Sequence, residues 1–291
     1  MSYGTVALLH PGNMGVTIGA AAATSGARVV WVSHQRGEAT RKRASQAGLV
    51  DVENLEDALR QSDIVLSVCP PHAAVDVAEQ VAARKFKGVY VDANAVSRAT
   101  AERIGEIVSR TGASFVDGGI IGSPVKQTGT TRLYLSGARA PEVAELFSKS
   151  MLDARAIGPE PGAASALKVA YAAWTKGTDA MLLAIRAYAS HEGVDDALLE
   201  EWRVSQPQLE KRCDRAAAAA TPKAWRYVGE MEEIAEAFER AGLPGGFHKA
   251  AAELCERLES FKDRTDPAPT IAEVIETLRG STEGRLKAVQ R

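Results

Sequence analysis

The sequence predicts two domains of different class: an α/β domain with a doubly wound, mostly parallel sheet, followed by an all-α C-terminal domain. Three observations lead to this prediction. Strand-like and helix-like stretches alternate in the first half, and a glycine turn joins the first strand-like stretch to the first helix-like one. No convincing strand follows residues 158–162 (GPEPG). A length of 291 residues suits two domains, which we place at residues 1–160 and 161–291.

The first half consists of short apolar, β-branched runs, each followed by a turn or a helical stretch. We expect strands at residues 6–9, 28–33, 63–68, 88–92, 114–117 and 133–136. We expect helices at residues 20–23, 37–48 and 73–83 and from residue 97 onward. This alternation is typical of a parallel sheet whose helices return over its two faces.

The second half has apolar residues at helical spacing throughout. We expect helices at residues 163–191, 195–204, 208–220, 223–241, 247–261 and 270–278. The first of these is long, and its apolar residues occupy more than one face. Since a helix that is apolar nearly all round must be buried nearly all round, we expect a homodimer in which a second copy covers part of it.

Composition excludes several classes of partner. A net charge of −2 provides no positive potential that would attract nucleic acid or an anionic membrane. No apolar run is long enough to span a bilayer. The three cysteines form no C-x-x-C pair, so we expect neither a disulfide framework nor a metal site. The N-terminus lacks the features of a signal peptide, and we therefore expect a cytoplasmic protein whose partner is a small-molecule substrate.

The turn between the first strand and the first helix has the form of a pyrophosphate site. Gly12 lets the backbone approach phosphate, Gly15 lets the helix pack close to the strand, and the free N–H groups of the helix face the anion. The motif is incomplete, because a histidine stands where the first glycine of G-x-G-x-x-G belongs. We assign cofactor binding in this turn to His10, Pro11, Gly12, Asn13 and Met14.

The end of the second strand favours NADP(H) over NAD(H). Sites that select NAD place a carboxylate there for the ribose 2′-hydroxyl, but this chain has none before Glu38. Ser33 and His34 can donate hydrogen bonds, and Arg36 offers a planar cation that suits a 2′-phosphate. The alternative is that the nearby arginines form a solvated helix face, and we apply it to Arg41 and Arg43.

Four stretches together resemble the β-hydroxyacid dehydrogenase family, which includes 6-phosphogluconate and 3-hydroxyisobutyrate dehydrogenases and, more distantly, imine reductases. Residues 10–15 are similar to the family's G-x-G-x-M-G turn, and residues 117–124 occupy the place of its substrate-binding D-x-x-V-S-G-G segment. Residues 162–168 resemble its G-x-x-x-x-x-K, whose lysine is catalytic. Cys69, Pro70 and Pro71 fall at its turn over the cofactor. The resemblance implies a Rossmann domain, a nicotinamide cofactor and a dimer whose cleft the partner completes.

The sequence departs from that family where a carboxylate substrate is normally held. Ile121 replaces a serine, Ala172 replaces an asparagine, and the later K-D pair falls on Glu232 and Glu233. The chain therefore resembles a separate branch with a distinct C-terminal helical domain. The resemblance extends to its fold and cofactor and leaves its substrate open.

Lys168 is the candidate for proton transfer. Hydride transfer from an alcohol needs a group that accepts the hydroxyl proton, and a lysine near a helix N-terminus can have its pKa lowered toward neutrality. The alternative is a lysine that extends its stem along an amphipathic helix. We assign substrate contacts to Gly122, Ser123, Pro124, Tyr171 and Thr175, and a contact with the nicotinamide ribose to Asn94. Whether Glu232, Glu233 or His248 reaches the active site is left open.

Three functions follow as hypotheses. The first is an NADP-dependent oxidoreductase that acts on a small hydroxy compound, a hydroxy acid or related molecule, or on its carbonyl partner. The second is an imine or iminium reductase, which would not need Lys168. The third is an NADP-binding sensor without turnover, which would have no reason to keep that lysine.

Overall fold

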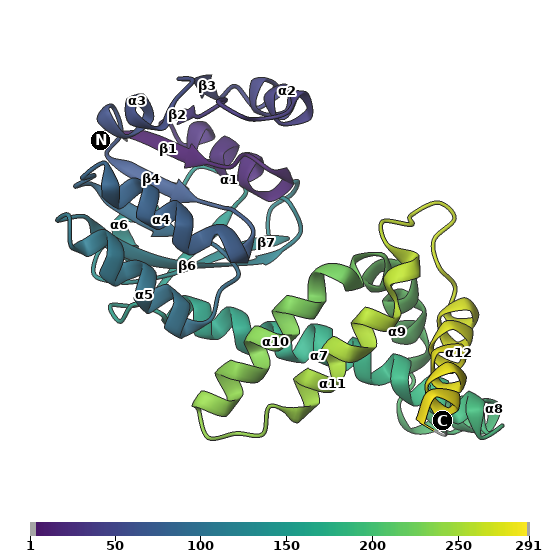
Figure 1. The fold of residues 1–291 in the computed structure, drawn as a ribbon. Helices are drawn as coiled ribbons and strands as arrows, with labels where there is room; N and C mark the ends of the chain where they lie inside the picture. Colours follow the sequence, from purple (N-terminus) through teal and green to yellow (C-terminus); the bar gives the residue numbers. More distant parts are fainter. Residues whose placement is uncertain (1–3, 290–291) are drawn as a thin grey trace. The chain divides into compact units, whose positions relative to one another are not determined.

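The computed structural model describes residues 4–289 and divides after Val169 into two compact units. We call them the N-terminal unit and the helical unit. Each has its own hydrophobic core. Figure 1 shows the strands and helices of both units.

The N-terminal unit is built on one eight-stranded sheet. Its order is β3-β2-β1-β4-β5-β6-β7-β8, and all neighbouring strands are parallel except β6 and β7, which are antiparallel. The strands are β1 (Thr5–Leu9), β2 (Arg28–Trp31), β3 (Val50–Asp51), β4 (Ile64–Ser67), β5 (Val89–Asp92), β6 (Ser114–Gly122), β7 (Thr131–Ser136) and β8 (Asp153–Gly158). The predicted doubly wound, mostly parallel sheet is confirmed.

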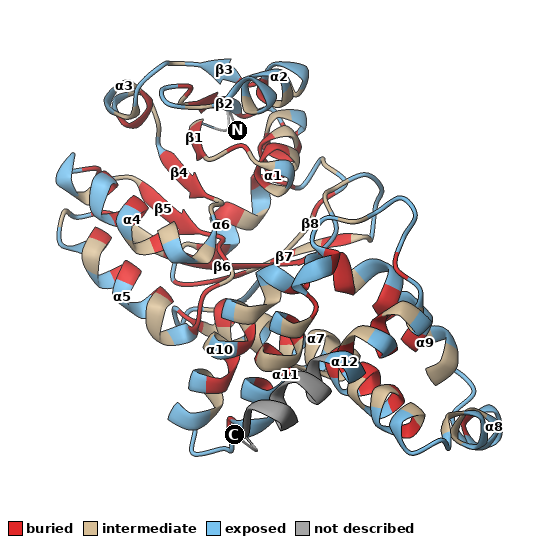
Figure 2. Cartoon of the chain, turned by 45° about the vertical axis from the view of Figure 1, so that its right-hand side comes forward, coloured by how far each residue is buried: buried red, intermediate tan, exposed pale blue. Residues whose placement is uncertain are grey.

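Helices cover both faces of this sheet because its strands are apolar on both faces. The helices are α1 (Asn13–Thr24), α2 (Glu38–Gln46), α3 (Leu55–Arg60), α4 (Ala74–Ala83), α5 (Arg98–Ser109) and α6 (Ala140–Glu145). In β1, Val6 and Leu8 pack with α1 and α6, whereas Ala7 and Leu9 pack with α3, α4 and α5. Strands β4 and β5 are buried along their length (Figure 2).

The order of the strands reverses at β1, which pairs with β2 on one side and β4 on the other. In open α/β sheets, ligands bind beyond the carboxyl ends of the strands at such a switch point. The residues that follow β1, β2 and β4 are therefore placed where a cofactor would lie.

The helical unit begins within α7 (Ala163–His191), whose first turns belong to the N-terminal unit. Helices α10 (Ala224–Arg240) and α11 (Gly246–Arg257) pack against each other. The remaining helices are α8 (Asp195–Ser205), α9 (Leu209–Arg215) and α12 (Ile271–Val289). Within the described residues, no helix is long and apolar enough to cross a membrane.

Several details differ from the prediction. The strand expected at residues 114–117 continues to Gly122, because Gly118 and Gly119 take part in the sheet. Two strands, β3 and β8, and two helices, α3 and α6, were not expected. The helix expected at residues 208–220 changes to a π-helical turn at Ala216–Ala220, where five alanines give no apolar period to direct the backbone.

Candidate cofactor and active site

The turn after β1 presents free backbone donors to a ligand. Gly12 donates its N–H to the His10 carbonyl over 2.7 Å, and α1 begins at the next residue. Gly12 is the N-cap and, among the described residues, no side chain accepts a hydrogen bond from the first turn of α1. Helix N-terminal N–H groups without a capping side chain form a site suited to an anion such as phosphate.

Gly15 holds α1 close to the strands. A Cβ at this position would lie 2.6 Å from the His10 carbonyl oxygen and 3.3 Å from Cβ of Val68. The first atom belongs to the backbone and the second is bonded directly to it, so neither can move without a shift of the main chain. This is the helix–strand packing for which we expected Gly15.

His10 stands at the first glycine position of the G-x-G-x-x-G motif and adopts a backbone conformation typical of glycine. Its φ of +67° lies in the left-handed region, which costs a side-chain-bearing residue about 1–2 kcal/mol. Burial and, second, the Arg36 cation lower the pKa of the imidazole to about 4. The ring is therefore neutral at pH 7, and its buried Nδ1 has no hydrogen-bond partner in the part of the chain that the structure describes.

A polar cavity of about 760 Å³ lies beside this turn. His10, His34 and Arg36 line it, together with Arg60 and Arg84. The Nε of Arg36 is also buried without a partner among the described residues. The cavity is therefore lined by two residues that each have one buried nitrogen without a partner among the described residues.

Arg41 makes two hydrogen bonds to the backbone of the loop after β2 that carries Arg36. The Arg41 guanidinium donates from Nη2 to the Ser33 carbonyl (2.9 Å) and from Nε to the Arg36 carbonyl (3.1 Å). Ser33 is buried and His34 is exposed. Arg41 is thus more than the solvated side chain we expected, since it fixes the loop that aims Arg36 into the cavity.

Asn94 fixes the turn that begins at Cys69. Its Oδ1 accepts from the Cys69 N–H (2.6 Å), and its Nδ2 donates to Ser67 Oγ (3.2 Å) and to Asp92 Oδ1. Asn94 is only 3% exposed, so a bond to a nicotinamide ribose would require it to give up one of these partners. Burial, together with the nearby Asp117 carboxylate, raises the pKa of Asp92 to about 7, although the hydrogen bonds from Asn94 oppose this rise.

A buried carboxylate caps the start of α7. Asp117, on β6, accepts from the Ser165 N–H (2.9 Å), from the Ser165 hydroxyl and from the Ser136 hydroxyl (2.9 Å). The Ser136 hydroxyl in turn accepts from the Ala164 N–H (3.1 Å). All three polar side chains are fully buried. This cluster could not be predicted from the spacing of its residues in the sequence, because Asp117 and Ser136 meet only through the pairing of β6 with β7.

This cap determines where Lys168 lies. One turn into α7, its Nζ donates to the Ile120 carbonyl of β6 over 2.7 Å. A Cβ on Gly119 would lie 2.7 Å from the Ala164 carbonyl oxygen and 3.2 Å from Cβ of Lys168, so a glycine is required for this approach. Burial lowers the pKa of the Lys168 ammonium below its usual range.

The predicted substrate residues divide between the two units. Gly122, the last residue of β6, has a φ of +119°. Ser123 follows it and is exposed, and its carbonyl accepts a hydrogen bond from Thr131 Oγ1 over 2.6 Å. Pro124 comes next. Tyr171 and Thr175 belong to the helical unit; Thr175 donates its hydroxyl to the Tyr171 carbonyl (3.0 Å). The roles of all five in binding stay predictions.

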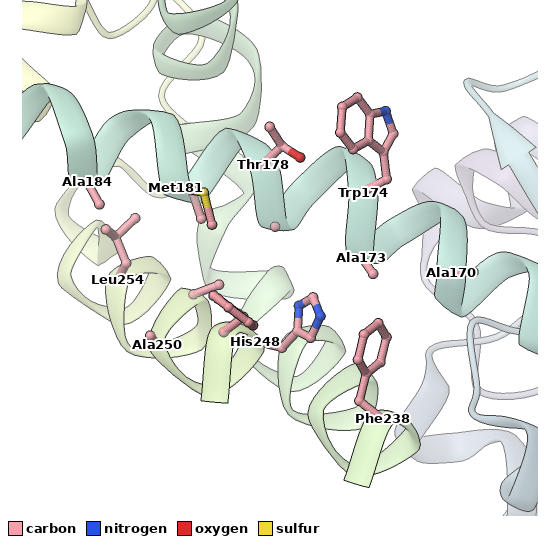
Figure 3. Close-up of a pocket in the computed structure, with 14 residues that line it drawn as sticks. Ala170, Ala173, Trp174, Thr178, Met181, Ala184, Phe238, His248, Ala250 and Leu254 are labelled. Carbon is pink, nitrogen blue, oxygen red and sulfur yellow. The ribbon is translucent and has the colours of Figure 1, made fainter. Parts of the chain in front are cut away.

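The remaining candidates lie elsewhere in the helical unit. Glu232 is exposed and Glu233 is partly buried on α10. His248 is 7% exposed on α11 and lines an apolar pocket (Figure 3). Within the described residues, no group of three or more His, Cys, Asp or Glu side chains is arranged to hold a metal.

Comparison with protein families gives two matches. Residues 5–154 match the NAD binding domain of 6-phosphogluconate dehydrogenase. Residues 189–258 match a domain of unknown function, DUF1932. The first match spans the whole sheet up to the start of β8, and the second lies entirely within the helical unit.

One curated relative is an uncharacterized 28.5 kDa protein from the 7S RNA 5′ region of Methanothermus fervidus. It is 33% identical over 165 residues, which are 57% of this chain and 63% of that protein. The chain thus matches less than two thirds of this relative's length.

Solved structures share the fold. A conserved protein of unknown function, described as similar to 3-hydroxyacid dehydrogenases, has a TM-score of 0.71 at 24% identity, covering 88% of this chain and 97% of that one. A 3-hydroxyisobutyrate dehydrogenase from Mycobacterium tuberculosis has a TM-score of 0.69 at 16% identity, and the match covers 95% of this chain and 99% of that one. An imine reductase from Pseudomonas sp. has a TM-score of 0.53 at 19% identity, and the match covers 95% of this chain and 99% of that one.

Proposed function

We propose, because this chain belongs to the family of the NAD-binding domain of 6-phosphogluconate dehydrogenase, that it is an NADP-dependent oxidoreductase. Its substrate would be a small hydroxy compound or the carbonyl partner of one. The nicotinamide, when bound, supplies or accepts the hydride. The residues of this chain bind the cofactor, position the substrate and move one proton.

The observation that carries the NADP preference is the pair of buried nitrogens without partners at His10 and Arg36. Both residues line the same polar cavity at the switch point, and a buried polar atom without a partner costs free energy that a ligand group bonded to it would recover. Two acidic side chains of α3, Glu56 and Asp57, also line the cavity. Asp57 is already bonded to Arg60 and Asn54, which reduces its repulsion of a phosphate.

Lys168 supports the catalytic part of the proposal. Its side chain is partly buried, its ammonium donates to the Ile120 carbonyl, and it lies about one turn beyond the Asp117 helix cap. Because burial lowers its pKa, more of the amine is neutral at pH 7 than in an exposed lysine. A neutral amine accepts the proton of a substrate hydroxyl during oxidation, and the ammonium returns it to the oxygen during reduction.

A second copy of this chain is the partner that the helical unit fits best. A stripe along α7 leaves five large apolar side chains between 37% and 66% exposed: Tyr171, Trp174, Met181, Ile185 and Tyr188. Their spacing of three, four or seven residues places them on one face of the helix. Since closed two-fold dimers bury the same surface of both copies, this face suits a homodimer.

A turnover screen tests the proposed reaction. The purified protein is mixed with NADPH or NADH and a panel of α- and β-keto acids, aldehydes and cyclic imines, and oxidation of the cofactor is followed at 340 nm. We expect turnover with NADPH on carbonyl compounds. Turnover on cyclic imines alone would instead support an imine reductase, and tight NADPH binding with no turnover on any compound would support a sensor.

A further inference from the structure

The loop that carries Arg36 is a strained turn. It comprises residues 33–37, after β2, and we call it the β2 loop. The Arg36 N–H closes the turn by donating to the Ser33 carbonyl over 3.0 Å, and Gln35 has a φ of +58°. This left-handed conformation costs a residue with a side chain about 1–2 kcal/mol. Such conformations persist where the surrounding structure holds them, and they cluster at ligand sites.

Arg41, on α2, holds both ends of this turn. Its Nη2 donates to the same Ser33 carbonyl (2.9 Å), and its Nε donates to the Arg36 carbonyl (3.1 Å). The planar guanidinium presents these two donors in a fixed geometry, which the single ammonium of a lysine cannot reproduce. The backbone is thereby fixed on both sides of Gln35.

Strand β3 and the residues after it anchor Arg41 and the β2 loop together. Arg41 Nη1 lies 4.0 Å from Oδ2 of Asp51, the last residue of β3. Oδ1 of Asp51 accepts from the Glu53 N–H (2.9 Å), and the Glu53 carbonyl accepts from the His34 N–H (2.9 Å). The β2 loop is therefore tied to α2 through Arg41 and to the residues after β3 through His34.

Arg41 does not line the cofactor cavity. The described residues that line this polar cavity include His34, Gln35 and Arg36 but not Arg41. The Arg41 side chain is 51% exposed, and two of its nitrogens already donate to backbone carbonyls. Its removal would therefore leave no void in the core, and it should alter the β2 loop without unfolding the N-terminal unit.

We propose that Arg41 is a positioning residue for cofactor selection. It holds the β2 loop in the conformation that places Arg36 beside the 2′-phosphate of NADP(H), and it does not touch the cofactor. This rests on the proposed function, since Arg36 must bind that phosphate. Arg41 should then matter for NADPH and not for NADH, which lacks the phosphate, and it should matter only while Arg36 is present.

Fluorescence titration of the whole protein with NADPH and NADH tests the first of these consequences. R41M should weaken NADPH about tenfold, because Arg36 loses its charge-assisted bond to the phosphate, and should weaken NADH less than about twofold. Equal losses for the two cofactors would show that Arg41 only supports the fold, and an unchanged NADPH affinity would likewise overturn the proposal.

Two further variants separate position from charge. R41K keeps the charge but loses the paired donors, so it should weaken NADPH about fivefold or more. The control is K42M, which removes a charge from the next residue of α2, an exposed lysine, and should change NADPH affinity less than about twofold. Full NADPH affinity in R41K would show that Arg41 acts through its charge and would overturn the positioning role.

The double variant R36A/R41M tests whether Arg41 acts through Arg36. It should bind NADPH as R36A does, within about twofold, because residues that act as a unit are not additive. Losses that multiply would mean that Arg41 acts independently, against the proposal. If R36A weakens NADPH and R41M does not, only the role of Arg41 fails. If R36A leaves NADPH affinity unchanged, the proposed NADP selectivity through Arg36 fails, and the role of Arg41 fails with it.

Discussion

At the scale of single residues, Lys168 is the side chain to which we assign proton transfer. If it transfers the proton, the variant K168M should lose about 10²- to 10⁴-fold in turnover, because general acid–base catalysis typically contributes that much. The affinity for NADPH should change little. The matched control is K211M, which alters an exposed lysine of α9 and should keep full turnover. Near-normal turnover by K168M would remove the lysine from the mechanism.

His10 makes folding stability depend on pH. The folded imidazole has a pKa of about 4, because it is buried and near Arg36, whereas the unfolded one keeps the usual value near 6.5. Between pH 6.5 and pH 4 the unfolded chain therefore binds a proton at His10 that the folded chain does not bind, and the free energy of unfolding falls as the pH drops toward 4.

Urea unfolding at pH 7 and pH 5 measures this effect. The wild type should lose about 1–2 kcal/mol more than the variant H10N between these pH values. Asparagine is the chosen replacement because it tolerates the left-handed backbone of this turn. The same pH dependence in both proteins would show that His10 is not the group responsible.

At the scale of elements, the junction between the sheet and α7 depends on the Asp117 cap. D117A would leave the buried Ser165 N–H and two serine hydroxyls without their acceptor, and we expect a loss of about 2–4 kcal/mol in unfolding free energy. The control D153A removes a carboxylate from a surface ion pair with Arg155 and should cost less than about 1 kcal/mol. Similar losses in the two variants, measured by urea unfolding, would contradict the role of the cap.

The elements that could be predicted from sequence are those with a local signal. Strand β1 is apolar on both faces, and the ends of α7 were predicted at the observed residues because glycines stand just outside both ends. Strand β8 was missed because it alternates small and charged residues and is partly exposed.

The candidate site shows the same division. The turn between β1 and α1 is a contiguous stretch, so its strand and glycines could be predicted together, whereas the helix was expected at residues 20–23 and begins at Asn13. The Asp117 cluster joins residues 19 and 48 positions apart, and only the pairing of β6 with β7 and the start of α7 bring them together. The partners of Asn94 are likewise set by the neighbouring strands β4 and β5.

At the scale of the whole molecule, we expect a homodimer through the exposed stripe of α7. Light scattering at micromolar concentration should give about twice the chain mass of 30.9 kDa. Y188E places a charge in the stripe and should give a monomer, whereas V204E, at an 83% exposed position of α8, should leave the dimer intact. A stable, active wild-type monomer would contradict this assembly.

The central claim is that the N-terminal unit selects NADP(H) through Arg36 and His10, and a fluorescence titration of the whole protein with NADPH and NADH tests it most directly. Wild type should bind NADPH more tightly, and R36A should lose about 1.5–3 kcal/mol of NADPH affinity with NADH almost unchanged, because a charge-assisted bond to the 2′-phosphate is removed. Tighter binding of NADH by the wild type, or equal losses for both cofactors in R36A, would contradict the claim.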